Sequence, residues 1–313
     1  MSHTPRILNG LHIAAEIKAE VSSAVQALVA DAITPGLAVI LVGHVAASEI
    51  YVRSKVKTCA ELGIYSELIT PPESITTGEL LSLVESLNAR EEIDGILIQL
   101  PLPVHVDTRL LLEAISPDKD VDGFHPVNAG RLQSAAYGAE SAQRLAPCTP
   151  AGILEILRRS EIRVAGENAV VLGRSEIVGK PAAMMLLNAS ATVTICHSRT
   201  RDLASFTRNA DILVAAIGRP GFVTPDMVKP GATLIDVGIN RIEAQEDVDR
   251  FFPDNAERAA LFARRGSTVV GDIHPAAFAI SGAYTPVPGG VGALTIAMLM
   301  QNTVTAARIR RQR

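Results

Sequence analysis

The chain has 313 residues, of which 48% are hydrophobic and 20% are charged, and it carries a formal net charge of -4. This composition is typical of a folded protein of about two domains, and the negative charge argues against nucleic acid as a main partner. The opening residues MSHTPRILNG lack the cationic and apolar parts of a signal peptide, and no apolar run reaches the roughly 18 residues that a membrane span needs. We therefore expect a cytoplasmic protein whose partners include neither nucleic acid nor a membrane.

The first part of the chain alternates helical and strand-like patterns. Apolar residues recur at helical spacing around Ile13, and the apolar run GLAVILVG that follows suits a buried parallel strand. The stretch ASEIYVRSKVKTCAELGI, residues 47–64, predicts an amphipathic helix that ends at Gly63, and a second helix follows over 78–89. The run IDGILIQLPLP predicts another buried strand. These elements together indicate a first α/β layer.

The second part of the chain begins after a stretch rich in turn residues, from Asp118 to Pro150, which predicts a hinge and a cleft. The strand-like runs NAVVLG, ATVTIC, ADILVAAIG and ATLIDVGIN then alternate with helices or turns, as in a doubly wound nucleotide-binding domain. A charged segment near 241–266 is expected to be a surface insertion. The chain closes with an apolar helix that ends in ARIRRQR, whose arginines we expect to form a solvated, fraying end rather than a basic patch.

A glycine turn joins the first of these strands to the next helix, in the sequence VVLGRSEIVGKP. Gly173 follows the strand and Gly179 opens the helix, an arrangement that can hold a pyrophosphate because helix N-terminal N–H groups favour an anion. The full three-glycine fingerprint is missing, so a plain tight turn is an equal alternative.

The end of the following strand, CHSRT, bears on the choice of cofactor. A carboxylate at this place usually binds the ribose 2′-hydroxyl of NAD, but this stretch contains none. Arg174, Ser198 and Arg199 instead favour the 2′-phosphate of NADP; the alternative is that they are ordinary surface residues.

Two further loops are unusual in composition. DKDVDG, residues 118–123, begins like a calcium loop, but Ala129 stands where such a loop needs a glutamate, so the loop is either a charged turn or one that presents Asp122 to a ligand. TPVPGGVG, residues 285–292, combines rigid prolines with bare backbone, which favours a ligand loop over a plain connector.

The cysteines give no sign of a metal site. Cys59, Cys148 and Cys196 are widely separated and odd in number, so they suggest neither a disulfide framework nor a zinc-ligand spacing. We expect three buried free thiols and no bound metal.

Tyr51 and Lys55 lie four residues apart in the predicted helix over 47–64 and therefore share a helix face. Short-chain dehydrogenases also have a Tyr-x-x-x-Lys pair, but theirs follows the nucleotide loop, whereas this one lies well before Gly173. The spacing alone therefore does not indicate carbonyl reduction.

In order along the chain, these segments resemble the bifunctional methylenetetrahydrofolate dehydrogenase/methenyltetrahydrofolate cyclohydrolase family, the FolD type. The resemblance covers nearly the whole chain and rests on PGLAVILVG, YVRSK, DGILIQLPLP, PDKDVDGFHPVNAGRL, PCTP, GRSEIVGKP, DVGIN and TPVPGGVG. It departs at Ala293–Leu294, where the family usually has Pro-Met, and in the longer charged segment. It implies NADP-dependent oxidation of 5,10-methylenetetrahydrofolate to the methenyl form and hydrolysis to 10-formyltetrahydrofolate, in one-carbon metabolism.

The resemblance also implies which residues form the sites. It places the catalytic lysine at Lys55, with an orienting tyrosine at Tyr51, a glutamine partner at Gln99 and a pterin-binding carboxylate at Asp122. Hydrolysis needs an acid/base group, and Lys55 is the candidate. The remaining substrate positions are Leu100, Pro288, Gly289 and Gly290, and the NADP positions are Gly173, Arg174, Ser175, Ser198, Arg199 and Ile239.

The fold that the resemblance implies is α/β with two domains and a homodimeric assembly. Residues 1–122, completed by 286–313, are expected to form a small α/β catalytic domain that binds folate, and residues 123–285 a Rossmann-type doubly wound NADP-binding domain. The C-terminal helix is expected to return to the first domain. A dehydrogenase without the hydrolytic activity and a nucleotide-sensing binding protein are the alternatives.

Overall fold

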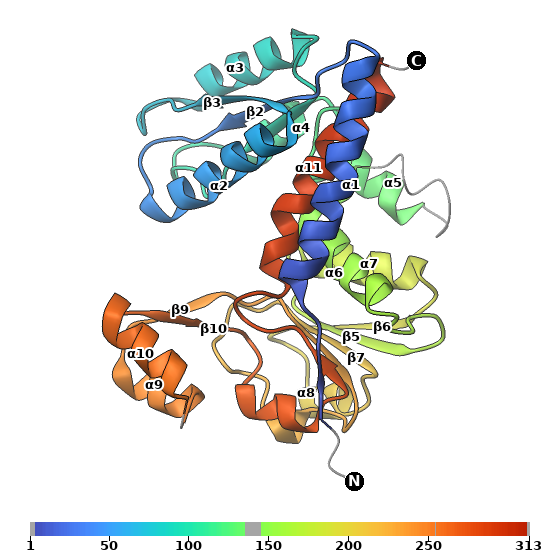
Figure 1. The fold of residues 1–313 in the computed structure, drawn as a ribbon, viewed down its shortest axis with the longest axis vertical. Helices are drawn as coiled ribbons and strands as arrows, with labels where there is room; N and C mark the ends of the chain where they lie inside the picture. Colours follow the sequence, from blue (N-terminus) through green and yellow to red (C-terminus); the bar gives the residue numbers. More distant parts are fainter. Residues whose placement is uncertain (1–3, 135–144, 254, 312–313) are drawn as a thin grey trace. The chain divides into compact units, whose positions relative to one another are not determined.

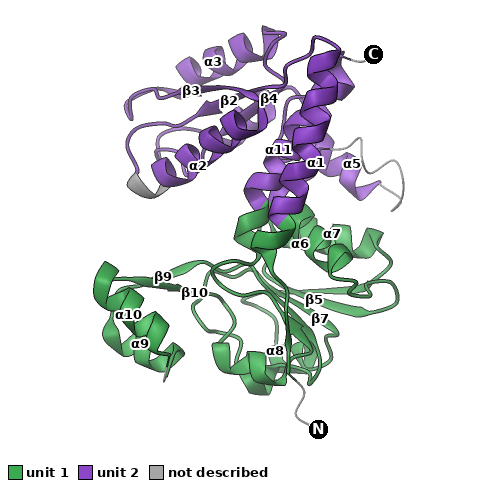
Figure 2. Cartoon of the chain, viewed as in Figure 1, with its two compact units in different colours: residues 1–13, 149–294 green, residues 14–148, 295–313 purple. Residues whose placement is uncertain are grey.

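The computed structural model of the chain describes residues 4–134, 145–253 and 255–311 (Figure 1). These residues fall into two compact units: unit 1 is 1–13 with 149–294, and unit 2 is 14–148 with 295–313 (Figure 2). Of the hinge predicted at 118–150, residues 135–144 lie outside the described part of the chain.

The compact units change over at 148/149, whereas the predicted domain boundary lies at 122/123. The first residues of the chain belong to unit 1 because the short strand β1 (Arg6–Ile7) pairs with β11 (Ala283–Tyr284) in the sheet of that unit. Helices α1 (Gly10–Ala30) and α11 (Val291–Arg311) each begin in unit 1 and continue into unit 2.

Unit 2 contains a parallel sheet of three described strands in the order β3–β2–β4. All five residues of the central strand β2 are buried, as expected for an apolar run covered on both faces. Figure 1 shows helices α2 and α3 on opposite sides of this sheet. The elements of unit 2 after α1 are β2 (Gly36–Ile40), α2 (Ala46–Leu62), β3 (Tyr65–Ile69), α3 (Thr77–Ala89), β4 (Gly95–Ile98), α4 (Thr108–Ala114) and α5 (Pro126–Gln133).

Most of these elements were visible in the sequence patterns. Helices α1, α2 and α3 and strands β2 and β4 confirm the predictions, and Gly63 ends α2 in the left-handed conformation, with φ of 75°. The patterns do not predict β3, because this edge strand reads YSELI and none of its residues is fully buried. They do not predict α5 either, because its residues lie in the stretch rich in turn formers.

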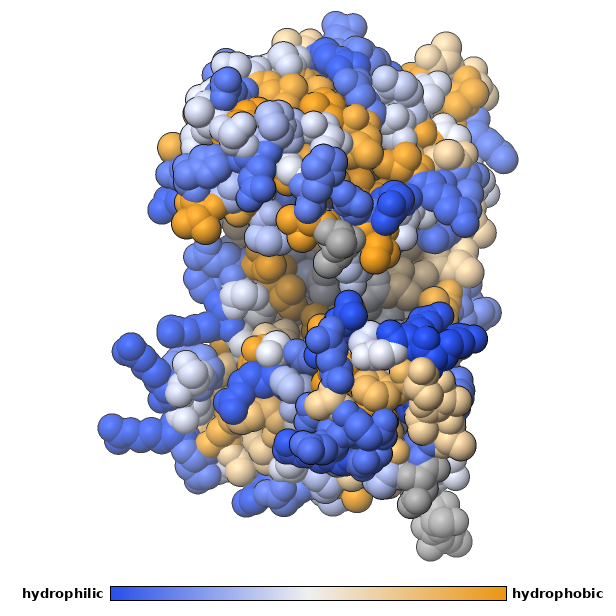
Figure 3. Space-filling view, turned by 90° about the vertical axis from the view of Figure 1, so that its left-hand side faces the viewer, coloured by the Kyte–Doolittle hydropathy of each residue, from blue (hydrophilic) through white to orange (hydrophobic). Residues whose placement is uncertain are grey.

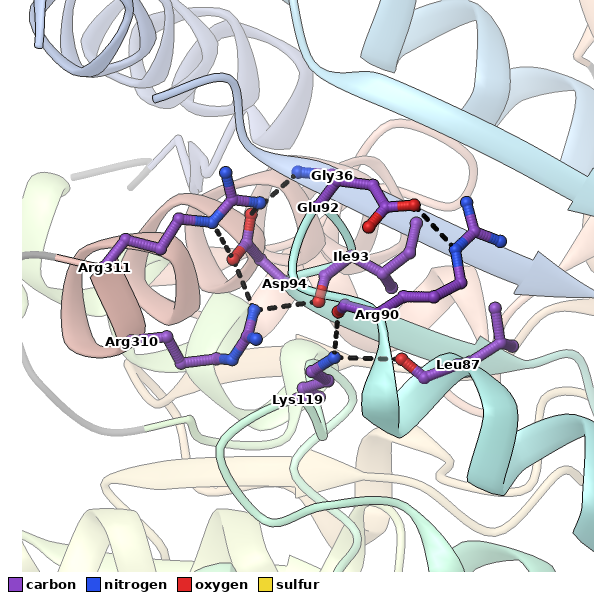
Figure 4. Close-up of polar contacts among 9 residues, drawn as sticks. All are labelled: Gly36, Leu87, Arg90, Glu92, Ile93, Asp94, Lys119, Arg310 and Arg311. Carbon is purple, nitrogen blue, oxygen red and sulfur yellow. Dashed lines mark hydrogen bonds and ion pairs between the residues drawn. The ribbon is translucent and has the colours of Figure 1, made fainter. Parts of the chain in front are cut away.

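The last turn of α11 contradicts the expected solvated, fraying end. Arg310 and Arg311 donate hydrogen bonds to the carboxylate of Asp94 at 2.6 to 2.9 Å, and the N–H of Gly36 donates to it at 3.0 Å (Figure 4). The Asp94 side chain is fully buried, and those of Arg310 and Arg311 are only 18% and 23% exposed. The prediction is wrong because the partner of these arginines lies far away in the sequence, just before β4. The contacts confirm that the C-terminal helix returns to the first domain.

Unit 1 contains a parallel sheet of six described strands in the order β1–β11–β8–β7–β5–β6. Its strands β5 to β8 coincide with the four predicted runs, which confirms the doubly wound arrangement. Strands β1 and β11 have two residues each, too few to give a sequence pattern. The other elements of unit 1 are α6 (Cys148–Arg159), β5 (Asn168–Leu172), α7 (Gly179–Asn188), β6 (Thr192–Cys196), α8 (Leu203–Thr207), β7 (Ile212–Ala215), η2 (Pro225–Met227), β8 (Thr233–Asp236), β9 (Asn240–Ile242), α9 (Gln245–Phe251), α10 (Ala256–Arg265), β10 (Thr268–Val270) and η3 (Pro275–Ile280).

The charged segment forms the helices α9 and α10 between the antiparallel strands β9 and β10. It has a small core of its own, made of the buried side chains of Ile242, Val248, Phe251 and Val270. No residue of α10 is fully buried. The segment is therefore a surface insertion, as predicted, with a small core of its own, and the ring of Phe251 contacts that of His274 outside it, at 5.5 Å between centroids.

Charged and polar residues cover much of the face shown in Figure 3, with apolar residues between them. No described helix combines the length and the apolar character that crossing a membrane would require.

Candidate active site

In unit 2, helix α2 and strand β4 bring a lysine and a glutamine together. The side-chain nitrogen Nζ of Lys55 donates a hydrogen bond to Oε1 of Gln99 at 2.9 Å. Gln99 directly follows β4, and its backbone N–H donates to the carbonyl of Ile40 in β2. Its side-chain amide also donates to the carbonyl of Leu100 at 2.8 Å, so the Oε1 atom is held toward Lys55. The predicted pair of Lys55 and Gln99 is thus present in the structure.

Asp122 lies in a tight turn whose shape is set by the neighbouring carboxylate, Asp120. The Asp120 carboxylate accepts hydrogen bonds from the N–H groups of Phe124 and His125 and from the side-chain amide of Asn128, at 2.8 to 3.1 Å. For the carboxylate of Asp122, the described residues provide one hydrogen-bond donor, the thiol of Cys148, whose Sγ atom lies 4.0 Å from Oδ1. Asp120 therefore builds the turn, whereas a role for Asp122 in binding the pterin ring stays a prediction.

The electrostatics of Asp122 link it to Lys55. Burial raises the pKa of the Asp122 carboxyl to about 6, the charge of Lys55 opposes this rise, and the charge of Asp120 adds to it. Because the charge of Lys55 acts on this carboxyl, the structure brings Lys55, Gln99 and Asp122 into one site.

Cys148 is a member of this site that the sequence patterns do not single out. Its thiol lies 3.4 Å from the carbonyl of Val121, and the side-chain amide of Asn302 in α11 donates to the same carbonyl at 2.8 Å. Burial, and then the negative charge of Asp122, raise the pKa of Cys148, so the thiol stays neutral. All three cysteines are free and buried, as predicted; the motif PCTP was the only signal for this one.

A substrate-binding role for Tyr51 and Leu100 stays a prediction. Tyr51 lies one turn before Lys55 on α2 and is 49% exposed, and Leu100 follows Gln99 and is partly buried. Within the described residues, no cluster of three or more His, Cys, Asp or Glu side chains could hold a metal ion.

In unit 1, a pocket of about 290 Å³ opens at the ends of β5, β6 and β7. Three of the predicted cofactor residues line it, namely Gly173, Arg174 and Ser198. The sequence patterns do not identify the rest of the lining, which consists of Leu172, Cys196, His197, Leu203, Ala216, Ile217, Arg219 and Phe222. The lining contains two arginines and no carboxylate, which suits the phosphates of NADP.

The glycine turn at this pocket needs glycine at two positions. Gly173 has a φ of 118°, and a Cβ atom there would lie 2.2 Å from the carbonyl oxygen of Ala216. A Cβ atom on Gly179 would lie 2.3 Å from the carbonyl oxygen of Gly173. The strand, turn and helix can therefore come this close only with these glycines.

The other three predicted cofactor residues do not line the pocket. The hydroxyl of Ser175 accepts hydrogen bonds from the N–H groups of Val178 and Gly179 at 3.2 Å, so it shapes the turn before α7. Arg199 is exposed, and Ile239, after β8, is 51% exposed. A role for Arg199 and Ile239 stays a prediction.

The predicted substrate loop, residues 285–292, belongs to unit 1. The buried hydroxyl of Thr285 accepts a hydrogen bond from the N–H of Asp236, and the carbonyl of Gly289 accepts one from the N–H of Leu11. Arg258 of the charged insertion donates to the carbonyl of Val287 at 2.5 Å. The loop is thus held in place by three elements. A role for Pro288, Gly289 and Gly290 in folate binding stays a prediction.

Two family models match this chain. The catalytic-domain model of tetrahydrofolate dehydrogenase/cyclohydrolase matches residues 8–122, and the NAD(P)-binding-domain model of the same family matches residues 147–311. The bifunctional protein FolD of Koribacter versatilis is 62% identical, over 97% of this chain and 97% of that protein.

Solved structures show the same likeness. The bifunctional FolD of Campylobacter jejuni has a TM-score of 0.86 and 44% identity, over 97% of this chain and 99% of that one. The methylenetetrahydrofolate dehydrogenase-cyclohydrolase of Trypanosoma brucei, complexed with NADP cofactor and an inhibitor, has a TM-score of 0.85 and 35% identity, over 97% of this chain and 98% of that one. The chain therefore belongs to the tetrahydrofolate dehydrogenase/cyclohydrolase family, as a bifunctional enzyme that combines an NADP-dependent oxidoreductase with a hydrolase acting on tetrahydrofolate derivatives.

Proposed function

We propose that both reactions take place on a folate held beside Lys55, and that Lys55 is the acid/base group of the hydrolysis. The observation that carries this proposal is the hydrogen bond from Lys55 Nζ to Gln99 Oε1 at 2.9 Å, in a site that also contains the carboxylate of Asp122. A lysine whose nitrogen is held by a fixed acceptor is suited to act as the general acid and base of this hydrolysis.

The oxidation needs positioning more than it needs a base. Hydride leaves a carbon that is flanked by two nitrogens, and their lone pairs stabilise the cation that forms. Bound NADP accepts this hydride. In this chain Gly173, Arg174 and Ser198 would hold the cofactor, because they line the pocket of unit 1.

The hydrolysis needs a proton to move twice. Water must lose a proton as its oxygen attacks the methenyl carbon, and a ring nitrogen must gain a proton as its bond to that carbon breaks. The Lys55 amine can take the first proton and give the second. Gln99 accepts one N–H of the Lys55 side chain, and this hydrogen bond holds the nitrogen in place for both transfers.

Asp122 has a different task. As a carboxylate it accepts hydrogen bonds from the N–H groups of the pterin ring, and so orients the folate next to Lys55. Tyr51 lies one helical turn before Lys55 and is half exposed, which suits a wall of the same site.

The test compares Lys55→Met with Lys57→Met, both on α2. Lys57 is a matched control because its side chain is 77% exposed and pairs with Glu61 instead. Purified protein is given methylenetetrahydrofolate and NADP, and the reduced nicotinamide and the methenyl chromophore are followed together. We expect the parent and Lys57→Met to show only a transient methenyl signal, whereas Lys55→Met still reduces NADP but accumulates methenyl product. Hydrolysis at the parental rate in Lys55→Met removes the lysine from this role.

The same assay separates the alternatives for the parent protein. Accumulating methenyl product would indicate a dehydrogenase alone, and no turnover would indicate a nucleotide sensor. A transient methenyl signal with steady reduction of NADP supports both activities.

We also propose that the chain forms a homodimer and works in the cytoplasm. The dimer is supported by the family resemblance and by the open edge of the unit 1 sheet, where β6 carries Ile195, 42% exposed. Light scattering on the purified protein should give twice the chain mass of 33.1 kDa. A single species of the chain mass would contradict the dimer.

A further inference from the structure

A pair of buried carboxylates in unit 1 takes no part in the chemistry above. Asp272 follows β10 and is fully buried, and Asp236 ends β8 and is 1% exposed. Buried carboxylates are costly unless their oxygens are hydrogen-bonded, so their partners show what the pair does.

The Asp272 carboxylate binds three consecutive backbone N–H groups of the loop that follows β7. Its Oδ2 atom accepts from Ile217 and Gly218 at 2.7 and 2.9 Å, and its Oδ1 atom accepts from Arg219 at 2.8 Å. Oδ1 also accepts from the side-chain amide of Asn240 in β9 at 2.9 Å. One carboxylate thus holds the loop over 217–219 against β9.

Asp236 in turn holds Asp272. Its Oδ1 atom accepts from the N–H of Asp272 at 2.8 Å and from that of Gly238 at 3.0 Å, and its Oδ2 atom accepts from Ile273 at 2.9 Å. The end of β8 therefore fixes the backbone from which the Asp272 side chain projects.

Two glycines, Gly238 and Gly271, pack against the two carboxylates so closely that neither position has room for a side chain. A Cβ atom on Gly238 would lie 2.4 Å from Oδ1 of Asp272, and one on Gly271 would lie 1.9 Å from Oδ2 of Asp236. The backbone at these glycines limits where the two carboxylates can lie. The position of the loop over 217–219, which is hydrogen-bonded to Asp272, is limited in the same way.

The loop held by Asp272 is one wall of the cofactor pocket. Ile217 and Arg219 line the pocket together with Arg174 and Ser198. The Arg219 guanidinium also stacks on the ring of Phe222, another lining residue, at 4.3 Å from the ring centroid. A shift of the loop would therefore change the pocket at both an apolar and a cationic side chain.

We infer that Asp272, held by Asp236, is a positioning residue for the cofactor: it fixes the loop over 217–219 that forms the pocket wall, and it does not touch the cofactor itself. Three successive N–H groups would otherwise form a receptor for an anion, and the carboxylate fills that receptor from inside the protein. This role of Asp272 in NADP binding rests on the proposed function in one respect, because hydrolysis is the control activity in its test.

The test uses the variant Asp272→Asn, which keeps the shape of the side chain but replaces one acceptor oxygen by an N–H donor. We expect the Kd for NADP, measured by calorimetry, to rise by roughly tenfold to a hundredfold, since hydrogen bonds to a charged group are lost. The KM for NADP in the oxidation should rise in parallel. Hydrolysis of methenyltetrahydrofolate without cofactor should stay within about twofold of the parent, because no cofactor takes part in it.

The matched control is Asp249→Asn, on the exposed face of α9, which should bind NADP as the parent does. Asn240→Ala is a milder second variant that removes a single hydrogen bond to Asp272 and decides the matter if Asp272→Asn does not fold. Weaker NADP binding with normal hydrolysis in either variant supports the inference. Unchanged NADP affinity, or an equal loss of both activities, overturns it. If the parent lacks hydrolysis, the proposed function fails, whereas the NADP affinities still test the role of Asp272.

Discussion

At the scale of single residues, the loop DKDVDG shows how neighbouring carboxylates come to have different tasks. Asp120 accepts hydrogen bonds from two backbone N–H groups and from the side-chain amide of Asn128, and so it stabilises the turn. The carboxylate of Asp122, two residues later, has no such role in the turn, and we propose that it binds the pterin ring. Both are aspartates in the same turn, and only their surroundings separate the two roles.

The raised pKa of Asp122 predicts a pH dependence of folate binding. Burial, opposed by the charge of Lys55, raises this pKa to about 6. Above that pH the carboxyl is ionised and accepts hydrogen bonds from the pterin ring; below it the carboxyl is protonated and loses this capacity. We expect the affinity for a folate ligand, measured by calorimetry between pH 5 and 8, to fall as the pH decreases through about 6, approaching about tenfold for each further unit.

The control for this prediction is Asp122→Asn, which has no carboxyl to titrate. It should bind folate weakly at every pH and lose the step near pH 6. A step of the same size in this variant would show that another group titrates.

At the scale of elements, the end of α11 is joined to the sheet of unit 2 by one buried carboxylate and two arginines (Figure 4). Close to this cluster, the ammonium of Lys119 donates to the carbonyls of Leu87 and Arg90 at the end of α3. The C-terminal helix, β4 and α3 are therefore connected through polar groups rather than through apolar packing alone.

Removing the arginines should destabilise the fold. In the double variant Arg310→Gln, Arg311→Gln, Asp94 would be a buried charge without its cations, at a cost of about 3–5 kcal/mol in the free energy of unfolding. Urea denaturation measures this difference. Arg308→Gln, which changes an exposed arginine of the same helix, is the matched control and should be nearly neutral.

Adding Asp94→Asn to the double variant should recover part of the loss, because the uncompensated charge is removed. A double variant as stable as the parent would show that the solvated, fraying end is the better description of this helix terminus.

At the scale of the whole molecule, the cofactor pocket lies in unit 1, whereas Lys55, Gln99 and Asp122 lie in unit 2. Because hydrolysis uses no cofactor, changes in the pocket should separate the two activities. We expect the double variant Arg174→Ala, Ser198→Ala to lose about tenfold or more of its preference for NADP over NAD, since charge-assisted contacts to the 2′-phosphate are removed.

This preference is measured as the ratio of kcat/KM for oxidation with the two cofactors, and hydrolysis serves as the internal control. Arg163→Ala, at a 79% exposed arginine outside the pocket lining, should leave the ratio unchanged. An unchanged ratio in the double variant would mean that other groups recognise the phosphate.

The sequence by itself determined helices α1 to α3, the buried strands β2, β4 and β5 to β8, and the glycine turn, because each of these depends on a local pattern. Apolar runs such as GLAVI mark strands covered on both faces, and Gly63 and Gly173 mark places where a side chain does not fit. Through the family resemblance it also pointed to Lys55, Gln99 and Asp122, which the structure brings together.

Only the tertiary structure decided which polar residues meet. Arg310 and Arg311 pair with Asp94, Asp272 holds the loop over 217–219, and Cys148 adjoins Asp122, although none of these partners is near the other in the sequence. An aspartate or arginine looks the same in the sequence whether it is solvated or buried. Its role depends on the charges and N–H groups that the folded chain places around it, and local periodicity carries no information about those.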